Sequence, residues 1–142
     1  MTTTPKRSPR LASPIIIVDT NIVIRYLTGD DMVKAEKFRT YLRKNRNLFV
    51  SDTVLAEIYF VLTKYYEFSR QKVLSWLTDL ICHPNIRCNE SLLKETIKIV
   101  SEYNVSFVDG FAAALALDQA DGRLLTYDLA LGKIAGIKRI EP

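Results

Sequence analysis

The sequence contains little of what a disulfide framework or a zinc site requires. Its 142 residues include two cysteines, Cys82 and Cys88, and a single histidine, His83. Without a Cys-x-x-Cys spacing or a second histidine, these residues indicate neither a disulfide-rich scaffold nor zinc coordination. Long hydrophobic runs are also missing: no stretch approaches the roughly eighteen apolar residues of a membrane span, and the N-terminus lacks the apolar segment of a signal peptide. We therefore expect a soluble cytoplasmic protein that needs no membrane.

An excess of charge of one sign is missing from most of the chain. The formal net charge is +4, but Lys6, Arg7 and Arg10 lie in an acid-free segment at the N-terminus. The remaining 17 basic and 16 acidic residues leave +1, so net charge alone does not predict a polyanionic partner. The segment 1–13 has almost nothing to bury, and we expect it to be a disordered basic leader. Residues 14–142 then form one domain, since a chain of this size can bury a full core.

Short apolar runs alternate with helical patterns from Ile15 onward. The runs that predict strands are 15–18, 48–50, 86–88, 123–126 and 137–140. Runs that are apolar at nearly every position are typical of strands buried on both faces, and their alternation with helices is typical of parallel α/β folds. We therefore expect a single three-layer α/β/α domain around one mostly parallel sheet of about five strands.

Between the strands, apolar residues recur at the spacing of a helix. A first helix is expected to follow Asp19. The other predicted helices cover 31–45, 52–65, 69–81, 90–103 and 107–119. Because Ser and Asp are good N-cap residues, Ser51 or Asp52 should cap the helix that follows them.

Four acidic residues stand where apolar elements end or turn. Asp19 follows the first strand and Asp128 follows the fourth, while Asp109 opens the last helix and Glu57 lies inside the helix over 52–65. The carboxyl ends of parallel strands share one rim, where ligands of such sheets bind. If all four carboxylates reach that rim, each close pair costs roughly 4 kcal/mol at 4 Å and an effective dielectric near 20. A bound cation or shifted pKa values would relieve that repulsion.

Each acid also has a local explanation. Asp19 and Asp128 could be N-caps of the segments that follow them. Asp109 stands three residues after Ser106, which is the spacing of a capping box. Glu57 lies too far inside its helix to cap it, but it could pair with a lysine or arginine at the surface. The functional interpretation therefore depends on the four acids acting together.

Clustered carboxylates are ligands that hard divalent cations prefer. Magnesium in particular is held by a few carboxylates together with water and phosphate oxygens. Such a cluster could activate water and stabilise the leaving oxygen of a phosphodiester. Asn21 and Thr126 would then support it by hydrogen bonding to the carboxylates or to bound water. Basic residues near the rim could follow a nucleic-acid backbone. The candidates are Arg25, Arg39, Arg43 and Lys133.

Four short motifs follow one another along the chain. They are Asp19-Thr20-Asn21 after an apolar strand, Glu57 within an apolar helix, Phe107-Val108-Asp109-Gly110-Phe111-Ala112-Ala113, and Thr126-Tyr127-Asp128 after another strand. In this order they resemble the motifs of the PIN domain family. The resemblance spans nearly all of residues 15–140, and it depends on the four motifs together, since none of them is specific alone.

The resemblance implies a metal-dependent endoribonuclease, a hydrolase that uses Mg²⁺ or Mn²⁺. Four positions match the family's catalytic and metal-binding acids: Asp19, Glu57, Asp109 and Asp128. Two match its supporting polar positions: Asn21 and Thr126. Small stand-alone PIN proteins are mostly VapC-type toxins of toxin–antitoxin pairs. The resemblance therefore also implies an RNA substrate, a homodimer, and a cognate antitoxin whose tail occupies the acidic site, while the basic leader departs from typical compact toxins.

Other functions share parts of this pattern. A haloacid-dehalogenase-like phosphatase needs a second acid two residues after the first, where this chain has Asn21. A response-regulator receiver does not account for Glu57 within a helix. A non-catalytic PIN-like module that binds RNA or protein, and a housekeeping RNA-processing nuclease, stay open as alternatives. One helix also carries extra aromatic residues, which could mark a dimer or antitoxin groove or pack in the core. They are Tyr59, Phe60, Tyr65 and Tyr66.

Overall fold

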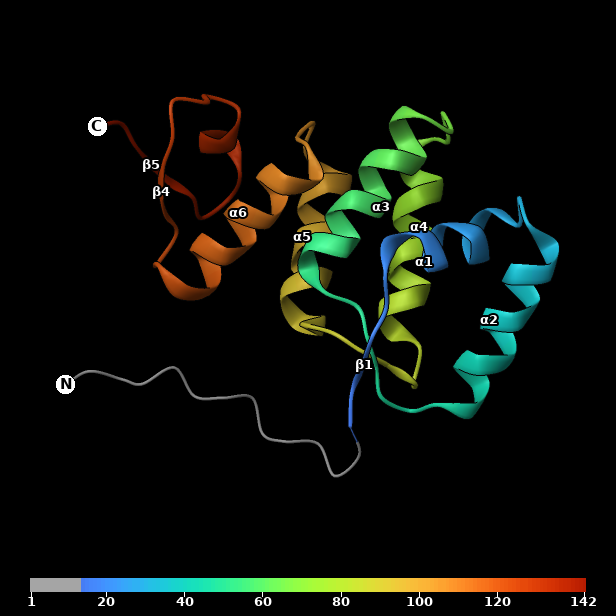
Figure 1. The fold of residues 1–142 in the computed structure, drawn as a ribbon. Helices are drawn as coiled ribbons and strands as arrows, with labels where there is room; N and C mark the ends of the chain where they lie inside the picture. Colours follow the sequence, from blue (N-terminus) through green and yellow to red (C-terminus); the bar gives the residue numbers. More distant parts are fainter. Residues whose placement is uncertain (1–13) are drawn as a thin grey trace.

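The computed structural model describes residues 14–142, so the expected leader over 1–13 lies outside the described residues. Six α-helices, five short strands and one 3₁₀ turn follow one another along the described part of the chain (Figure 1). The strands are β1 (Ile16–Ile17), β2 (Leu48–Phe49), β3 (Ile86–Arg87), β4 (Arg123–Leu125) and β5 (Lys138–Ile140). The helices are α1 (Thr20–Thr28), α2 (Met32–Lys44), α3 (Asp52–Lys64), α4 (Arg70–Cys82), α5 (Glu90–Glu102) and α6 (Phe107–Gln119), and the 3₁₀ turn η1 covers Leu131–Lys133.

The predicted helices and strands all form, close to the expected bounds. Local signals account for this, because the helix starts carry side chains that satisfy free backbone N–H groups. Ser51 is the cap of α3, and its hydroxyl accepts a hydrogen bond from the N–H of Val54 at 3.2 Å. Ser69 does the same for α4. The choice between Ser51 and Asp52 is thereby settled, and Asp52 is the first residue of the helix.

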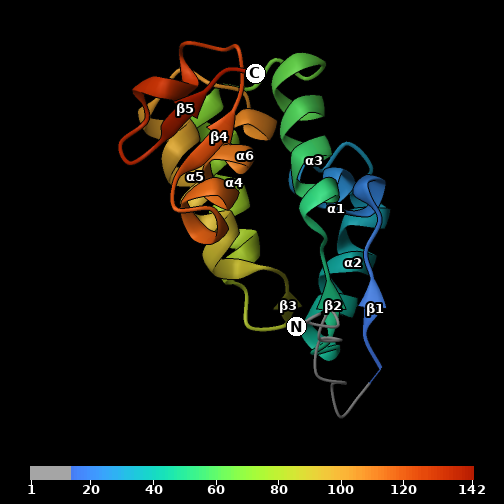
Figure 2. The ribbon, with the colours of Figure 1, turned by 90° about the vertical axis from the view of Figure 1, so that its left-hand side faces the viewer.

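The strands form two separate sheets, so the expectation of one sheet of about five strands is wrong. β1, β2 and β3 pair in parallel in that order, with Ile16 opposite Leu48 and Leu48 opposite Ile86. β4 and β5 pair in parallel in a second sheet. Figures 1 and 2 both show this second sheet well apart from β1, and in Figure 1 α6 lies between them.

The connection between β4 and β5 holds the second sheet in its place. Leu131 and Ile134 of this connection are 4% and 3% exposed and belong to the hydrophobic core. The N–H of Ala135 donates to the hydroxyl of Tyr103, the residue that ends α5, at 3.1 Å. The second sheet is therefore anchored to the end of α5 and to the hydrophobic core.

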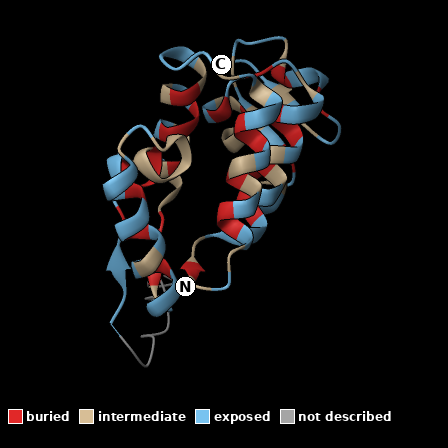
Figure 3. Cartoon of the chain, turned by 90° about the vertical axis from the view of Figure 1, so that its right-hand side faces the viewer, coloured by how far each residue is buried: buried red, intermediate tan, exposed pale blue. Residues whose placement is uncertain are grey.

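Helices make up most of the core. Figure 3 shows their buried residues as stripes that face neighbouring helices. α5 and α6 pack closely, since a Cβ atom on Gly110 would meet Cγ2 of Val100 at 2.5 Å. Ala113 and Ala114 are buried on the same helix, as expected for an alanine-rich helix packed between neighbours. Within residues 14–142, each helix is too short or too polar to cross a membrane.

Candidate functional site

Asp19 and Glu57 are linked at the end of β1 by Thr20. Asp19 is the N-cap of α1, and its Oδ1 accepts a hydrogen bond from the backbone N–H of Thr20 at 2.9 Å. The hydroxyl of Thr20, a residue only 5% exposed, donates to Oε2 of Glu57 on α3 at 2.8 Å. One buried threonine therefore holds two of the predicted acids, from different elements, at the same place.

Both of these carboxylates keep an oxygen atom that the described protein leaves free. Within residues 14–142, neither Asp19 Oδ2 nor Glu57 Oε1 accepts a hydrogen bond, and neither residue pairs with a lysine or arginine. The surface ion pair that could have explained Glu57 is thus missing there. Both side chains are exposed. Free, exposed carboxylate oxygens have the donor chemistry that a hard divalent cation requires.

Asp109 lies in the first turn of α6 and is half-buried. Its backbone N–H donates to the hydroxyl of Ser106, the N-cap of α6, at 3.1 Å. This is one half of the expected capping box. The start of α6 packs on α3, since the rings of Phe107 and Tyr59 lie 5.3 Å apart between centroids. The helix that carries Asp109 is therefore in direct contact with the helix that carries Glu57.

Asp128 and Thr126 form a tight turn after β4. The N–H of Asp128 donates to the hydroxyl of Thr126 at 3.0 Å, and Oδ1 of Asp128 accepts from the N–H of Ala130 at 2.9 Å. Asp128 therefore stabilises a turn and does not cap a helix as expected, since the N-cap of η1 (Leu131–Lys133) is Ala130 and makes no side-chain hydrogen bond. Asp128 remains exposed, so its carboxylate also faces solvent.

The structure thus links two of the four predicted acids through Thr20, and within residues 14–142 no hydrogen bond links Asp109 or Asp128 to them. Asp19 and Glu57 belong to the part of the molecule built on β1, α1 and α3, whereas Asp109 and Asp128 belong to α6 and the second sheet. Among residues 14–142, no three His, Cys, Asp or Glu side chains lie close enough together to hold a metal ion. The donor chemistry fits a divalent cation at Asp19 and Glu57, and the participation of all four acids stays a prediction.

A groove of about 760 Å³ lies beside β1 and reaches Asp19 and the exposed Asn21. Its lining is apolar along β1 and basic along α1 and α2. The lining residues include Ile16, Ile17, Ile22, Arg25, Lys34 and Lys37.

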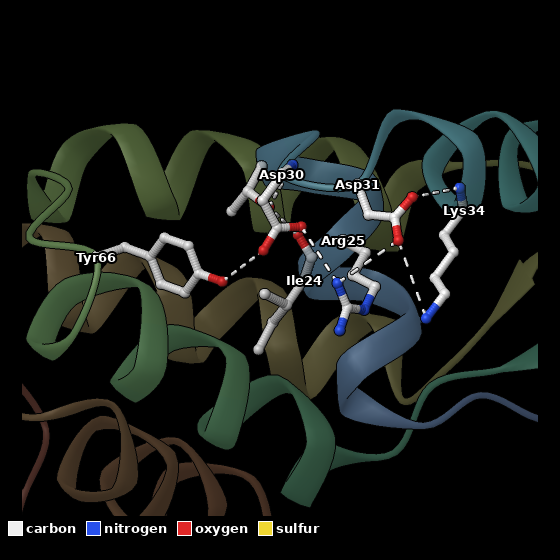
Figure 4. Close-up of polar contacts among 7 residues, drawn as sticks. Ile24, Arg25, Asp30, Asp31, Lys34 and Tyr66 are labelled. Carbon is white, nitrogen blue, oxygen red and sulfur yellow. Dashed lines mark hydrogen bonds and ion pairs between the residues drawn. The ribbon is translucent and has the colours of Figure 1, made fainter.

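Two of the basic residues that line this groove are held in place by neighbouring acids. Arg25 lies 3.8 Å from Asp30 and 4.0 Å from Asp31, and Lys34 lies 3.9 Å from Asp31 (Figure 4). Asp30 in turn accepts a hydrogen bond from the hydroxyl of Tyr66 at 3.0 Å. Among the basic residues considered for nucleic-acid binding, Arg25 lines the groove that reaches Asp19. Arg39 instead pairs with Glu36 at 3.5 Å on the surface of α2.

Thr20 is a candidate site residue that sequence reasoning did not single out. The sequence shows it only as the middle residue of Asp19-Thr20-Asn21, where all three side chains are good helix caps. Its burial next to two exposed acids is what gives it a role, because a buried hydroxyl must find a hydrogen-bond partner. Spacing alone does not reveal that the partner is Glu57, which lies 37 residues further along the chain.

Comparison with known proteins places the chain in a family. A search of curated proteins finds no match. The model of the PIN domain matches residues 16–137, a segment that contains all six predicted site residues. PIN domains are typically metal-dependent nucleases. Because the match covers most of the sequence and includes the Asp19–Thr20–Glu57 link, we conclude that this chain belongs to the PIN domain family.

Proposed function

We propose that this protein is an endoribonuclease that cleaves RNA phosphodiester bonds with the help of Mg²⁺ or Mn²⁺. The observation that carries the proposal is the link between Asp19 and Glu57 through Thr20. Capping of α1 requires Asp19 alone. A glutamate at the surface, such as Glu57, does not require a hydrogen bond from a buried residue. A buried threonine hydroxyl that bonds to Glu57 is accounted for if both carboxylates bind the same ligand and must be oriented toward it.

The chain's own residues prepare the site for a cation. Asp19 and Glu57 offer free oxygens to it, and Thr20 restricts the rotamers of Glu57 by occupying its other oxygen. A bound divalent ion would supply the positive charge that attracts a phosphodiester and makes water a better nucleophile. Asn21, in the first turn of α1, is within the same groove and would orient polar groups beside Asp19. Asp109 and Asp128, with Thr126 beside Asp128, are proposed to complete the acidic site.

We further propose that the protein acts as a VapC-type toxin in the cytoplasm, as a homodimer silenced by an antitoxin. The support is the order and spacing of the four motifs in a chain of only 142 residues. Exposed aromatic residues offer a partner surface: Phe60 and Tyr65 are 53% and 72% exposed and pack edge to face, with 5.9 Å between their ring centroids. Tyr59, in contrast, is buried against Phe107 and belongs to the core.

The alternatives are a housekeeping RNA-processing nuclease and a non-catalytic module that binds RNA or protein. Growth measurements separate the first from a toxin. Induced expression of a toxin should arrest growth, and Asp19→Asn should relieve the arrest, whereas a housekeeping nuclease should leave growth unchanged. The non-catalytic module is distinguished by cleavage itself, which the following experiment measures.

The central test is metal-dependent cleavage of a mixed RNA pool. Wild-type protein should cut RNA when Mn²⁺ or Mg²⁺ is titrated in and stop when the metal is chelated. Asp19→Asn should lower the rate by roughly 100-fold or more, because loss of even an outer-shell partner of a metal site typically costs about 10- to 100-fold. Asparagine is also a good N-cap, so this variant should stay folded.

Asp118→Asn is the matched control for the cleavage assay. Asp118 is an exposed acid on α6, the same helix as Asp109, and its substitution removes the same charge away from the proposed site. We expect it to cleave at the wild-type rate. Wild-type protein that binds RNA but never cuts it, with either metal, would overturn the nuclease proposal in favour of the non-catalytic module.

A further inference from the structure

Arg70 connects elements that lie far apart in the sequence. It is the first residue of α4 and is half-buried. Its Nε donates to the hydroxyl of Tyr59 on α3 at 3.1 Å. Its Nη2 donates to three carbonyl oxygens, those of Val100, Tyr103 and Val105, at 2.6, 3.1 and 3.3 Å. The first two lie at the end of α5, and the third lies in the short loop before α6. One guanidinium group therefore joins α3 to the segment that leads into α6.

Capping of α5 accounts for only part of this network. The last carbonyl groups of a helix have no partner inside the helix, and a cation close to them is favourable. The bonds from Arg70 to Val100 and Tyr103 are of this kind. The bonds to the hydroxyl of Tyr59 and to the carbonyl of Val105 lie outside α5, so capping does not explain them. A guanidinium group can make both sets of bonds because it presents five donors in a fixed plane.

Tyr59 extends the connection to α6 itself. Tyr59 is 7% exposed, and its ring centroid lies 5.3 Å from that of Phe107, the first residue of α6. The start of α6 is therefore held twice, through the loop before it and through the ring at its first residue. Asp109 lies in the same first turn. Its place relative to α3 depends on both contacts, and Arg70 takes part in each of them.

The other side of α3 carries Glu57. Two residues apart on a helix, the side chains of Glu57 and Tyr59 point roughly 160° away from each other. Glu57 accepts a hydrogen bond from Thr20 of α1, and Tyr59 packs on α6. Figures 1 and 2 both show α3 between α1 and α6. The separation between Glu57 and Asp109 is therefore set by the way α3 packs on α6.

We propose that Arg70 is a positioning residue for the acidic site and that it acts through Tyr59. The inference rests on the proposed nuclease function, because the effect of Arg70 is to place Asp109 relative to Glu57 around a divalent cation. A displacement of about 1 Å, even when it is caused by a change far from the reacting atoms, can lower a rate roughly 100-fold. A bond on the far side of α3 can therefore determine how well the acids share an ion.

Tyr59→Phe and Arg70→Lys test the two ends of this connection. Tyr59→Phe removes the hydroxyl that accepts from Arg70 and keeps the ring that packs on Phe107. Arg70→Lys keeps a cation that can bond to the end of α5, but a single ammonium group cannot also reach Tyr59 in the same geometry. We expect both variants to stay folded and to need roughly 10-fold more Mn²⁺ for half-maximal cleavage, as for other groups that orient metal ligands.

Thr63→Val is the matched control. It also removes a hydroxyl from α3, but this hydroxyl donates to the carbonyls of Tyr59 and Phe60 within the same helix. Its Mn²⁺ requirement should equal that of the wild type. The double variant, Tyr59→Phe with Arg70→Lys, should need no more Mn²⁺ than the weaker of the two single variants, because both changes break one connection.

Spin labels measure the placement of the helices without reference to cleavage. In a background whose two native cysteines are replaced by serine, labels are attached at Lys64→Cys and Asp118→Cys, exposed positions near the ends of α3 and α6. Electron paramagnetic resonance should then give one narrow distribution of distances between the labels. Adding Tyr59→Phe or Arg70→Lys should broaden or shift this distribution, and adding the control substitution should leave it unchanged.

The two measurements separate the failure of this proposal from the failure of the nuclease proposal. An unchanged distance distribution in Arg70→Lys and Tyr59→Phe would show that this bond does not hold α3 against α6, which overturns the positioning role. Active wild type with an equal Mn²⁺ requirement in Arg70→Lys would also overturn it, and would leave the nuclease proposal standing. Wild type that never cleaves RNA, while the distribution broadens in Arg70→Lys, would overturn the nuclease proposal and support only the connection between the helices.

Discussion

At the scale of single residues, Thr20 bonds to Asp19 through its backbone N–H and to Glu57 through its hydroxyl. Thr20→Val removes the hydroxyl that donates to Glu57 and keeps the shape of the side chain. We expect the cleavage rate to fall roughly 10- to 100-fold, as for other groups that orient a metal ligand. The free energy of unfolding should fall by only about 1 kcal/mol, the net value of one hydrogen bond.

Thr20→Ser is the matched control for this prediction, because it restores the donor and should recover most of the activity. A metal titration adds a readout that a merely structural role would leave unchanged: Thr20→Val should need more Mn²⁺ for half-maximal rate, while Thr20→Ser should resemble the wild type. Equal metal requirements in both variants would show that Thr20 contributes to packing alone.

The local bonds that Asp19 and Asp128 make leave each carboxylate an oxygen for another ligand. Asp19 caps α1 with one oxygen and leaves the other free, and Asp128 bonds to Ala130 with Oδ1 alone. A carboxylate has two oxygens, so a cap and a ligand do not exclude each other. Sequence patterns could identify both possible roles for these residues, but only the structure shows which oxygen each role uses.

At the scale of elements, the contact between α5 and α6 leaves little room for a side chain at Gly110. Gly110→Ala would place a Cβ atom 2.5 Å from Cγ2 of Val100. Because interiors are close-packed, we expect overpacking to cost about 1 to 3 kcal/mol of unfolding free energy. Denaturant unfolding of the variant measures this.

A double-mutant cycle gives the control for Gly110→Ala. Val100→Ala removes the methyl group that the new side chain would meet, so the double variant should be more stable than the sum of the two single changes predicts. Additive effects would show that the loss in Gly110→Ala arises elsewhere. Gly132→Ala, whose new Cβ would meet the flexible side chain of Arg139 at 3.2 Å, should be nearly neutral.

The elements themselves were largely predictable from the sequence, and their reasons are local. Ser51 and Ser106 start helices because their hydroxyls satisfy N–H groups within the same turn. The run from Ile15 to Val18 predicts a strand, since it is apolar at every position. Local patterns do not predict which strands pair with one another, because pairing depends on how helices that are distant in the sequence pack. The expected single sheet failed for this reason, although each of its strands exists.

At the scale of the whole molecule, the two sheets divide the predicted site. Asp19 and Glu57 lie with the three-stranded sheet, and Asp128 lies with the two-stranded one. The expectation that these acids share one rim assumed one continuous sheet, whereas the structure has two.

Metal binding should also be measurable as stability, independently of RNA cleavage. A ligand that binds only the folded protein adds about 2.7 kcal/mol at 100 times its dissociation constant. For a protein of this size that corresponds to an increase of roughly 5 to 10 °C in melting temperature. We expect Mn²⁺ to raise the melting temperature of the wild type and of Asp118→Asn, and chelation to reverse it. Asp19→Asn should show little or no increase, because it removes the charge that holds the ion while keeping the helix cap. An equal increase in Asp19→Asn would place the bound ion away from the Asp19–Thr20–Glu57 link.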